Sequence, residues 1–274
     1  MASDIAATAH PLRSWRHHAT AAMQLGLPLI GAQLAQTIIY TTDTIMIGWL
    51  GAPELAASVL GSQAVFSALM LGSGFALAIM PMVAQAVAAG DERMARRAGR
   101  MGLWIAAAYC AVMMVPLWFI DPILLALGQD PDVTVMARDY MRILQWSLFP
   151  ALLTLVFRSF LSALEHARIV LIATIAAALV NAVVNYGLIF GNFGLPRLEL
   201  QGAAIASFAS STLSVCILIG YTLWKPAVAR YQLHVRLWRA DWAALREVAS
   251  LGWPISLTVI AEVSLFTASS LLMG

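Results

Sequence analysis

The 274-residue sequence is 61% hydrophobic and only 11% charged, and its mean hydropathy is +0.81. These values lie outside the range of water-soluble domains and predict an integral membrane protein. The formal net charge of +2 gives no indication of a nucleic-acid partner.

The chain begins with a polar lead over residues 1–24. It contains Arg13, Arg16 and three histidines, but no apolar core followed by a small-residue cleavage site. We therefore expect a cytoplasmic lead and not a cleaved signal peptide.

Seven segments are apolar over enough residues to cross a hydrocarbon core about 30 Å thick, which takes about 20 helical residues. Lipid offers no hydrogen-bond partner to the backbone, and the alternation of a barrel strand is absent, so each segment is predicted to be a helix. The predicted fold class is an all-α polytopic membrane bundle. The predicted spans are 25–47, 59–88, 101–120, 143–164, 169–190, 202–224 and 251–274.

Positive charge is distributed unevenly over the predicted loops. Lys and Arg accumulate in the short cytoplasmic loops of membrane proteins. An N-terminus inside the cell leaves only Arg138, Arg142 and Arg197 on the outer side. We therefore expect a cytoplasmic N-terminus.

The first and last predicted spans resemble each other at a fixed offset of 226 residues, and each begins with Leu-Gly-x-Pro, at Leu25 and at Leu251. Both begin on the cytoplasmic side, so the repeat is parallel, with six helices followed by the start of a second copy. The predicted organisation is a cytoplasmic lead (1–24), a six-helix lobe (25–225), a cytoplasmic inter-lobe linker (226–250) and the first helix of a truncated second lobe (251–274). The rest of that second lobe is a partner that this chain is expected to lack.

Polar side chains lie inside several predicted spans. Asp43 is in the first, Asn181 and Asn185 share one face of the fifth, and Ser207 is in the sixth. The helical rise places these four about 20 to 28 Å above the cytoplasmic edge, so they can meet within one lobe. Glu262, in the seventh span, falls near the midplane. An acid inside a membrane costs about 2.5 to 3.5 kcal/mol and usually faces a cavity or a partner.

Structural interpretations of the same residues stay open. Asp43 can be a hydrated carboxylate at a frayed helix end. Asn181, Asn185 and Ser207 can be packing contacts between helices. Glu262 lies in a helix whose neighbours in the second lobe are outside the chain, so its surroundings are open as well.

Motifs spread over most of the chain resemble the multidrug and toxic compound extrusion (MATE) family. Glu262 further resembles the acid that takes part in cation coupling in the bacterial NorM-like branch. The motifs are Leu25-Gly26-x-Pro28 followed by Asp43 and Gly48, Pro81-Met82-Val83-Ala84-Gln85, Phe157-Arg158-Ser159-Phe160-Leu161, Asn181-x-x-x-Asn185-Tyr186 and Gly202-Ala203-Ala204-Ile205-Ala206-Ser207.

The resemblance implies a two-lobe transporter that exports organic cations or toxins across the bacterial inner membrane in exchange for Na+ or H+. It assigns ion coupling to Asp43 and Glu262 and a supporting polar site to Asn181, Asn185 and Ser207. It implies no cofactor, and no metal beyond Na+ at Asp43, Asn181 and Asn185. Drug molecules and membrane lipid are the expected partners.

Two other functional classes fit part of the pattern. A lipid or polysaccharide flippase of a related superfamily shares the helix count, but it should display several cationic residues in its cavity, and only Arg158 is a candidate. An enzyme needs a metal or nucleophile constellation, whereas all five histidines lie outside the predicted spans and no His-Glu-x-x-His occurs. A secondary transporter is therefore predicted, with the flippase as the alternative.

Overall fold

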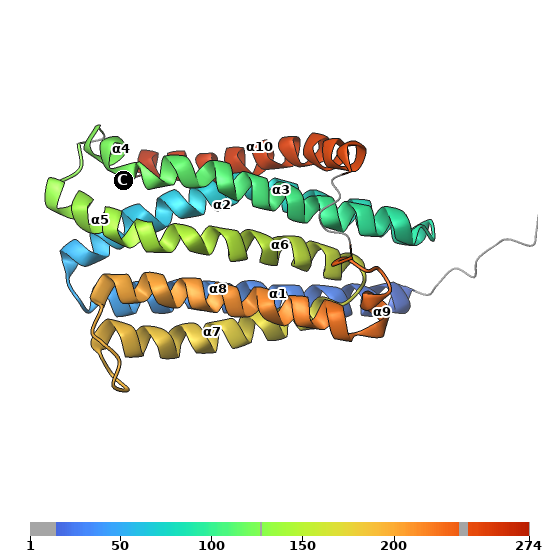
Figure 1. Ribbon diagram of the computed structural model, residues 1–274, viewed down its shortest axis with the longest axis horizontal. Helices are drawn as coiled ribbons and strands as arrows, with labels where there is room; N and C mark the ends of the chain where they lie inside the picture. The colour runs from blue at the N-terminus through green and yellow to red at the C-terminus, as the bar shows by residue number, and fades with distance from the viewer. Residues whose placement is uncertain (1–14, 127, 236–240, 274) are drawn as a thin grey trace, which may run out of the picture.

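A computed structural model describes residues 15–126, 128–235 and 241–273. These residues form helices joined by turns, without a strand among them, and the long helices lie side by side along one axis (Figure 1). The predicted all-α membrane bundle is thereby confirmed. The long elements are α1 (Trp15–Gly48), α2 (Ala52–Ala88), α3 (Glu92–Trp118), α5 (Pro131–Leu144), the 3₁₀ turn η1 (Gln145–Ser147), α6 (Leu148–Ala163), α7 (Ala167–Phe190), α8 (Glu199–Trp224) and α10 (Trp242–Met273).

Two short helices mark the two ends of the bundle. α4 (Ile120–Ala126) lies at one end and α9 (Pro226–Ala229) at the other, and we call these the α4 end and the α9 end (Figure 1). α1 and α10 both run from the α9 end towards the α4 end. The two copies of the sequence repeat are therefore parallel, as expected.

Five of the described helical segments are long and apolar enough to cross a membrane: α2, α3, the continuous Pro131–Ala163, α7 and α8. α1 and α10 have the required length but are not among these five, although seven spans were predicted. In α1 the polar residues Gln33, Gln36 and Asp43 interrupt the apolar sequence. The seven predicted spans thus correspond to seven long helical segments of unequal apolarity.

The fourth predicted span begins much earlier than expected. Its helix starts at Pro131 and not at residue 143, because α5 continues through η1 into α6. Charged residues such as Asp132 and Arg138 give α5 the composition of a loop. Its other face is apolar and buried, however, with Ala137 and Met141 inaccessible to solvent.

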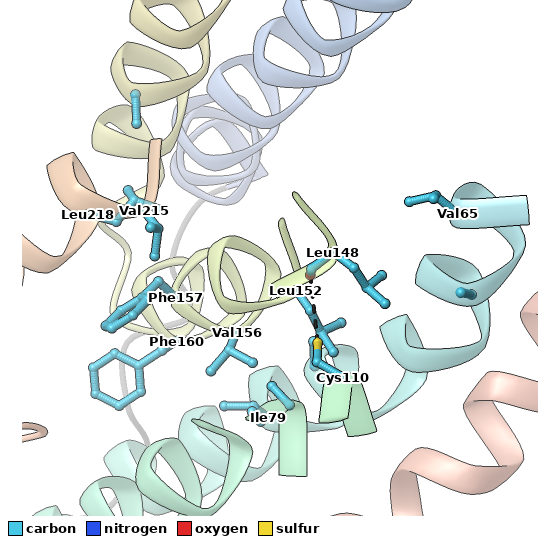
Figure 2. Packing of buried hydrophobic residues seen from close by; sticks show 14 of the residues in the cluster. Val65, Ile79, Cys110, Leu148, Leu152, Val156, Phe157, Phe160, Val215 and Leu218 are labelled. Carbon is cyan, nitrogen blue, oxygen red and sulfur yellow. Dashed lines mark hydrogen bonds between the residues drawn. The ribbon is translucent and has the colours of Figure 1, made fainter. Parts of the chain in front are cut away.

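The helices pack in two groups that share the central helix α6. α1 packs chiefly against α7, with smaller contacts to α2 and α8, whereas α2 contacts α3, α5, α6 and α10. α10 lies along α3, on the opposite side of the bundle from α7 (Figure 1). Figure 2 shows the core face of α6, where Leu152 and Val156 point towards Ile79 of α2 and Cys110 of α3. This packing fixes the rotation of α6 and therefore decides which of its residues face away from the core.

The segment between α8 and α10 packs back onto the α9 end of the bundle. Within its described part, Val228, Tyr231 and Leu233 are buried, and Tyr231 meets Phe160 edge-on with ring centroids 5.9 Å apart. His234 stacks on Phe157 of the same helix. This connector is therefore a packed part of the bundle over residues 228–234.

The start of α10 is held by a second set of contacts. Arg97 of α3 contacts Asp241 Oδ2 through Nε and Nη2, each at 2.5 Å. The backbone N–H of Ala244 donates to Asp241 Oδ1 at 3.2 Å, so Asp241 also caps α10. One carboxylate thus joins the first turn of α10 to α3.

Candidate functional site

A polar stripe along α1 faces a cavity of about 330 Å³ inside the bundle. Its members stand three or four residues apart, which places them on one face of a helix. They are Gln33, Gln36, Tyr40, Asp43 and Thr44. Tyr40 is 48% exposed, so the cavity is open along α1.

The other walls of the cavity come from six elements and carry many hydroxyl groups. α2 contributes Ser58 and Ser62, and Tyr140 of α5 lies 3.2 Å from Ser62 through its hydroxyl oxygen. The remaining polar lining comes from η1, α6, α7 and α8: Ser147, Thr154, Arg158, Thr174, Ser207, Ser210, Ser211 and Ser214. A drug-sized molecule fits a cavity of this volume.

Asp43 lies on this wall in contact with α7 and α8. Asn185 Nδ2 donates a hydrogen bond to Asp43 Oδ1, and Ser207 Oγ donates to Asp43 Oδ2 at 3.3 Å. Asn185 Nδ2 also donates to Asn181 Oδ1 at 3.2 Å. The four polar residues singled out from helical rise therefore converge at one place.

The close packing of α7 and α8 places this cluster. Gly202 lies directly against the backbone of Leu188, and a Cβ atom there would approach the Leu188 carbonyl to 2.8 Å. The spacing of four residues stacks Asn181 and Asn185 on the face of α7 towards α1, and both are fully buried. The asparagines are therefore inside the lobe and not on its lipid-facing surface.

Two polar atoms of the cluster are buried without a hydrogen-bond partner among the described residues: Asn181 Nδ2 and Asn185 Oδ1. An unpaired buried polar group is costly, and such groups often mark a site that binds something. Asn185 Oδ1 and the Asp43 carboxylate together offer oxygen ligands with a single negative charge. This donor set suits a proton on the carboxylate or a monovalent cation.

Among the residues that the structure describes, no group of three His, Cys, Asp or Glu side chains is placed to hold a metal ion. A multivalent cation normally requires several carboxylates. The cluster, with one carboxylate beside its amide oxygens, carries less negative charge than such a cage.

Glu262 lies apart from this cluster. It is exposed on α10, which packs against α2 and α3, whereas the cluster joins α1, α7 and α8. The structure therefore brings Asp43, Asn181, Asn185 and Ser207 together and does not bring Glu262 to them.

Sequence reasoning missed several lining residues. Gln36 and Tyr40 belong to the same helical stripe as Asp43, and their spacing is a signal that the sequence contains. The contact between Ser62 and Tyr140 joins residues 78 positions apart. A contact of that kind depends on how α2 and α5 pack and has no local signature.

Comparisons with known proteins show to which family the chain belongs. The sequence profile of the MatE family matches residues 28–187. The chain is 49% identical over 261 residues to a protein named probable multidrug resistance protein NorM from Rhizobium meliloti, a match covering 95% of this chain and 56% of that protein. A protein of the same name from Agrobacterium fabrum is 46% identical over 262 residues, again 95% and 56%. The chain thus spans about half the length of the curated relatives it matches.

Solved structures show the same fold at low sequence identity. A eukaryotic MATE transporter superposes with a TM-score of 0.82 at 19% identity, over 90% of this chain and 54% of that chain. A multidrug resistance MATE family transporter in an outward-facing conformation gives a TM-score of 0.78 at 21% identity, with the same coverage. The resemblance inferred from the motifs is confirmed: this chain belongs to the MatE family of membrane transporters.

Proposed function

We propose that this chain supplies the first lobe of a secondary active exporter that exchanges organic cations or toxins for Na+ or H+. The observation that carries the proposal is the single carboxylate of Asp43 on the wall of a drug-sized cavity, with Asn185 and Ser207 as hydrogen-bond donors. The names of the relatives, which are multidrug resistance proteins, support the same substrate class.

Exchange follows from competition for one charge. A cationic substrate in the cavity and a coupling ion at Asp43 both seek the same negative charge, so occupancy by one lowers the affinity for the other. Proton or Na+ binding also changes which hydrogen bonds the carboxylate accepts. Asn185 and Ser207 transmit that change to α7 and α8, which line the same cavity.

The polar neighbours are suited to assist the coupling ion. A proton needs only the Asp43 carboxylate, whereas Na+ also needs oxygen ligands from its surroundings. The free acceptor Asn185 Oδ1 and the oxygen of Asn181 are such ligands. We therefore propose Asp43, Asn181 and Asn185 as the place where the coupling ion binds.

The wider organisation is part of the proposal. A second lobe begins in α10, after the inter-lobe segment 226–250, and Glu262 is its own ion-coupling group. The N-terminus is cytoplasmic and the membrane is the bacterial inner membrane, as the arginine distribution favours. Half of the transport pathway then comes from residues beyond this chain.

The test uses the two-lobe protein in proteoliposomes loaded with a fluorescent organic cation. We expect an imposed Na+ or H+ gradient to drive efflux of the dye, and Asp43→Asn to abolish gradient-driven efflux while the protein still melts cooperatively. Efflux that persists in Asp43→Asn contradicts the role of Asp43. A wild-type protein that moves no cation under either gradient contradicts the exporter assignment itself.

A further inference from the structure

Arg158 lines the same cavity as Asp43, and the proposed exporter function does not use it. The residues of α6 that line the cavity follow the three- and four-residue spacing of one helix face: Leu148, Ala151, Thr154, Leu155 and Arg158. Arg158 is half-buried. Placing a charged side chain within a membrane costs free energy, so a guanidinium on the cavity face of a membrane helix is a candidate functional group.

The packing of α6 fixes its rotation about its own axis and thereby the direction in which Arg158 faces. Phe157, the preceding residue, stacks on His234, and Phe160 packs edge-on against Tyr231. Figure 2 shows Val156, Phe157 and Phe160 pointing into the core on the same helix. That face is anchored on the connector and on α2. The opposite face, which carries Arg158, is therefore held towards the cavity.

The guanidinium of Arg158 has no ion pair or hydrogen bond with any other residue that the structure describes. Glu165, seven residues further on, does not pair with it either. A guanidinium whose donors are not used within the protein is available for charge-assisted hydrogen bonds to an anion. The free guanidinium therefore favours an anionic partner that enters the cavity.

Arg158 and Asp43 lie towards opposite ends of the bundle. Each is five residues from the end of its helix, Arg158 from Ala163 at the α9 end and Asp43 from Gly48 at the α4 end. α7 has 24 residues and spans the bundle, a length of about 36 Å. Subtracting five residues at each end places the Cα atoms of Asp43 and Arg158 roughly 20 Å apart along the axis of α7.

We propose that Arg158 is an anion-binding site at the α9 end of the cavity, and that it selects molecules bearing a carboxylate. A guanidinium binds a carboxylate through two parallel charge-assisted hydrogen bonds. Substrate discrimination in this cavity then depends on two residues: Asp43 favours a cationic group and Arg158 a carboxylate. The inference deepens the proposed function and rests on it for the role of Asp43 in binding the cationic group.

The test measures binding of three dyes that share a xanthene core to the purified 274-residue chain, by fluorescence anisotropy. Rhodamine 123 is a methyl ester and purely cationic, rhodamine 110 has the free carboxylate as well, and fluorescein has the carboxylate without the cation. We expect Arg158→Gln to weaken rhodamine 110 and fluorescein about tenfold and to leave rhodamine 123 within about twofold. Arg158→Lys keeps the charge and should retain most of the preference.

Arg168→Gln is the matched control, because Arg168 is an exposed cation at the same end of the bundle and does not line the cavity. The proposal is overturned if Arg158→Gln weakens all three dyes alike, if it changes none of them, or if Arg168→Gln has the same effect. It is also overturned if wild type binds no dye with a carboxylate. A thermal melt of each variant separates lost binding from lost folding.

Asp43→Asn separates this inference from the proposed function. It should weaken rhodamine 123 and rhodamine 110 and should not weaken fluorescein. If Asp43→Asn changes no cationic dye while Arg158→Gln still weakens fluorescein, cation recognition at Asp43 fails and the anion site stands. If Asp43→Asn weakens the cationic dyes while Arg158→Gln leaves fluorescein unchanged, the exporter site stands and the role of Arg158 is contradicted.

Discussion

Asn185 and Asp43 are 142 residues apart in the sequence and share a direct hydrogen bond, from the amide Nδ2 to the carboxylate Oδ1. Ser207 of α8 donates to the other carboxylate oxygen. Two helices therefore hold one carboxylate of a third helix. Any change in the charge of Asp43 therefore acts on both contacts. Because the two donors lie on different helices, each can be removed by its own mutation.

Asn185→Ala should impair both stability and ion coupling. It leaves Asp43 Oδ1 without its donor and opens space beside a fully buried position, and we expect a loss of about 1 to 3 kcal/mol in the free energy of unfolding. If Na+ is the coupling ion, the Na+ concentration needed for half-maximal efflux should rise at least about tenfold, because the oxygen ligand Asn185 Oδ1 is lost. Thermal melting and ion titration of efflux measure the two effects. An unchanged ion dependence contradicts the role of Asn185.

Ser207→Ala should impair stability and ion coupling in the same direction as Asn185→Ala, but by less. The hydroxyl contact at 3.3 Å is longer than an ideal O–H···O bond, so its loss should cost about 0.5 to 1.5 kcal/mol. Thr212→Ala is the matched control, because this hydroxyl on the same helix only bonds back to the carbonyl of Phe208. If both variants shift the ion dependence equally, the effect is one of α8 and not of the contact to Asp43.

Helical rise was sufficient to predict the convergence of Asp43, Asn181, Asn185 and Ser207. The rise per residue is nearly constant in a membrane helix, so depth follows from counting along the chain. Facing directions were predictable for the two asparagines because a spacing of four residues places them on one side. Local regularity accounts for both successes.

Packing between helices was not predictable in the same way. The sequence named Arg158 as a cationic candidate for the cavity, but its rotation towards the cavity depends on how Phe157 and Phe160 anchor α6 against the connector. The connector has no apolar periodicity, so burial of Tyr231 and Leu233 had no sequence signal. α5 was missed because its charged face obscured a buried apolar one.

The chain should lose stability as pH falls below about 6.5, and His234 should account for part of that loss. Burial lowers the pKa of His234 below 6.5. The folded state then binds fewer protons than the unfolded state, so the stabilisation is complete above that pH and is lost as pH falls through the folded-state pKa. Thermal melts between pH 7.5 and 5.5 should show a smaller decline for His234→Gln than for wild type.

His166 contributes in the same direction and has to be measured beside it. Burial lowers the pKa of His166, and the charge of Lys225 adds to the effect. His166→Gln should therefore reduce the pH dependence independently, and the double variant should be flatter than either single one. A decline that is identical in wild type and in both variants contradicts the assignment.

Asp241 should contribute to the free energy of unfolding in two separable ways. Asp241→Asn removes the ion pair with Arg97 and retains an oxygen to cap α10, so we expect a loss of about 0.2 to 1 kcal/mol for this partly exposed pair. Asp241→Ala also removes the cap, which adds about 1 kcal/mol. Chemical denaturation of both variants measures the difference. Exchanging the two charges, in Arg97→Asp with Asp241→Arg, should recover the ion pair but not the cap.

Gly74 should be intolerant of even one added methyl group, because α2 and α10 touch there through their backbones. A Cβ atom at Gly74 would lie 2.3 Å from the backbone nitrogen of Ser256, and one at Gly252 would lie 2.8 Å from the Cα atom of Phe75. Backbone atoms cannot move aside as side chains do, so Gly74→Ala must displace α10 at a cost of about 1 to 3 kcal/mol.

Gly220→Ala is the control for that substitution, since it also adds a methyl group inside a helix but meets nothing within 4 Å. It should be neutral or stabilise by up to about 1 kcal/mol through helix propensity. Displacement of α10 can be followed by maleimide alkylation of Ser256→Cys with Cys216 replaced by Ser, because Ser256 is fully buried and Cys216 is exposed. Alkylation should accelerate several-fold with Gly74→Ala and remain slow with Gly220→Ala. Equal protection in the two backgrounds means that the position of α10 does not depend on this crossing.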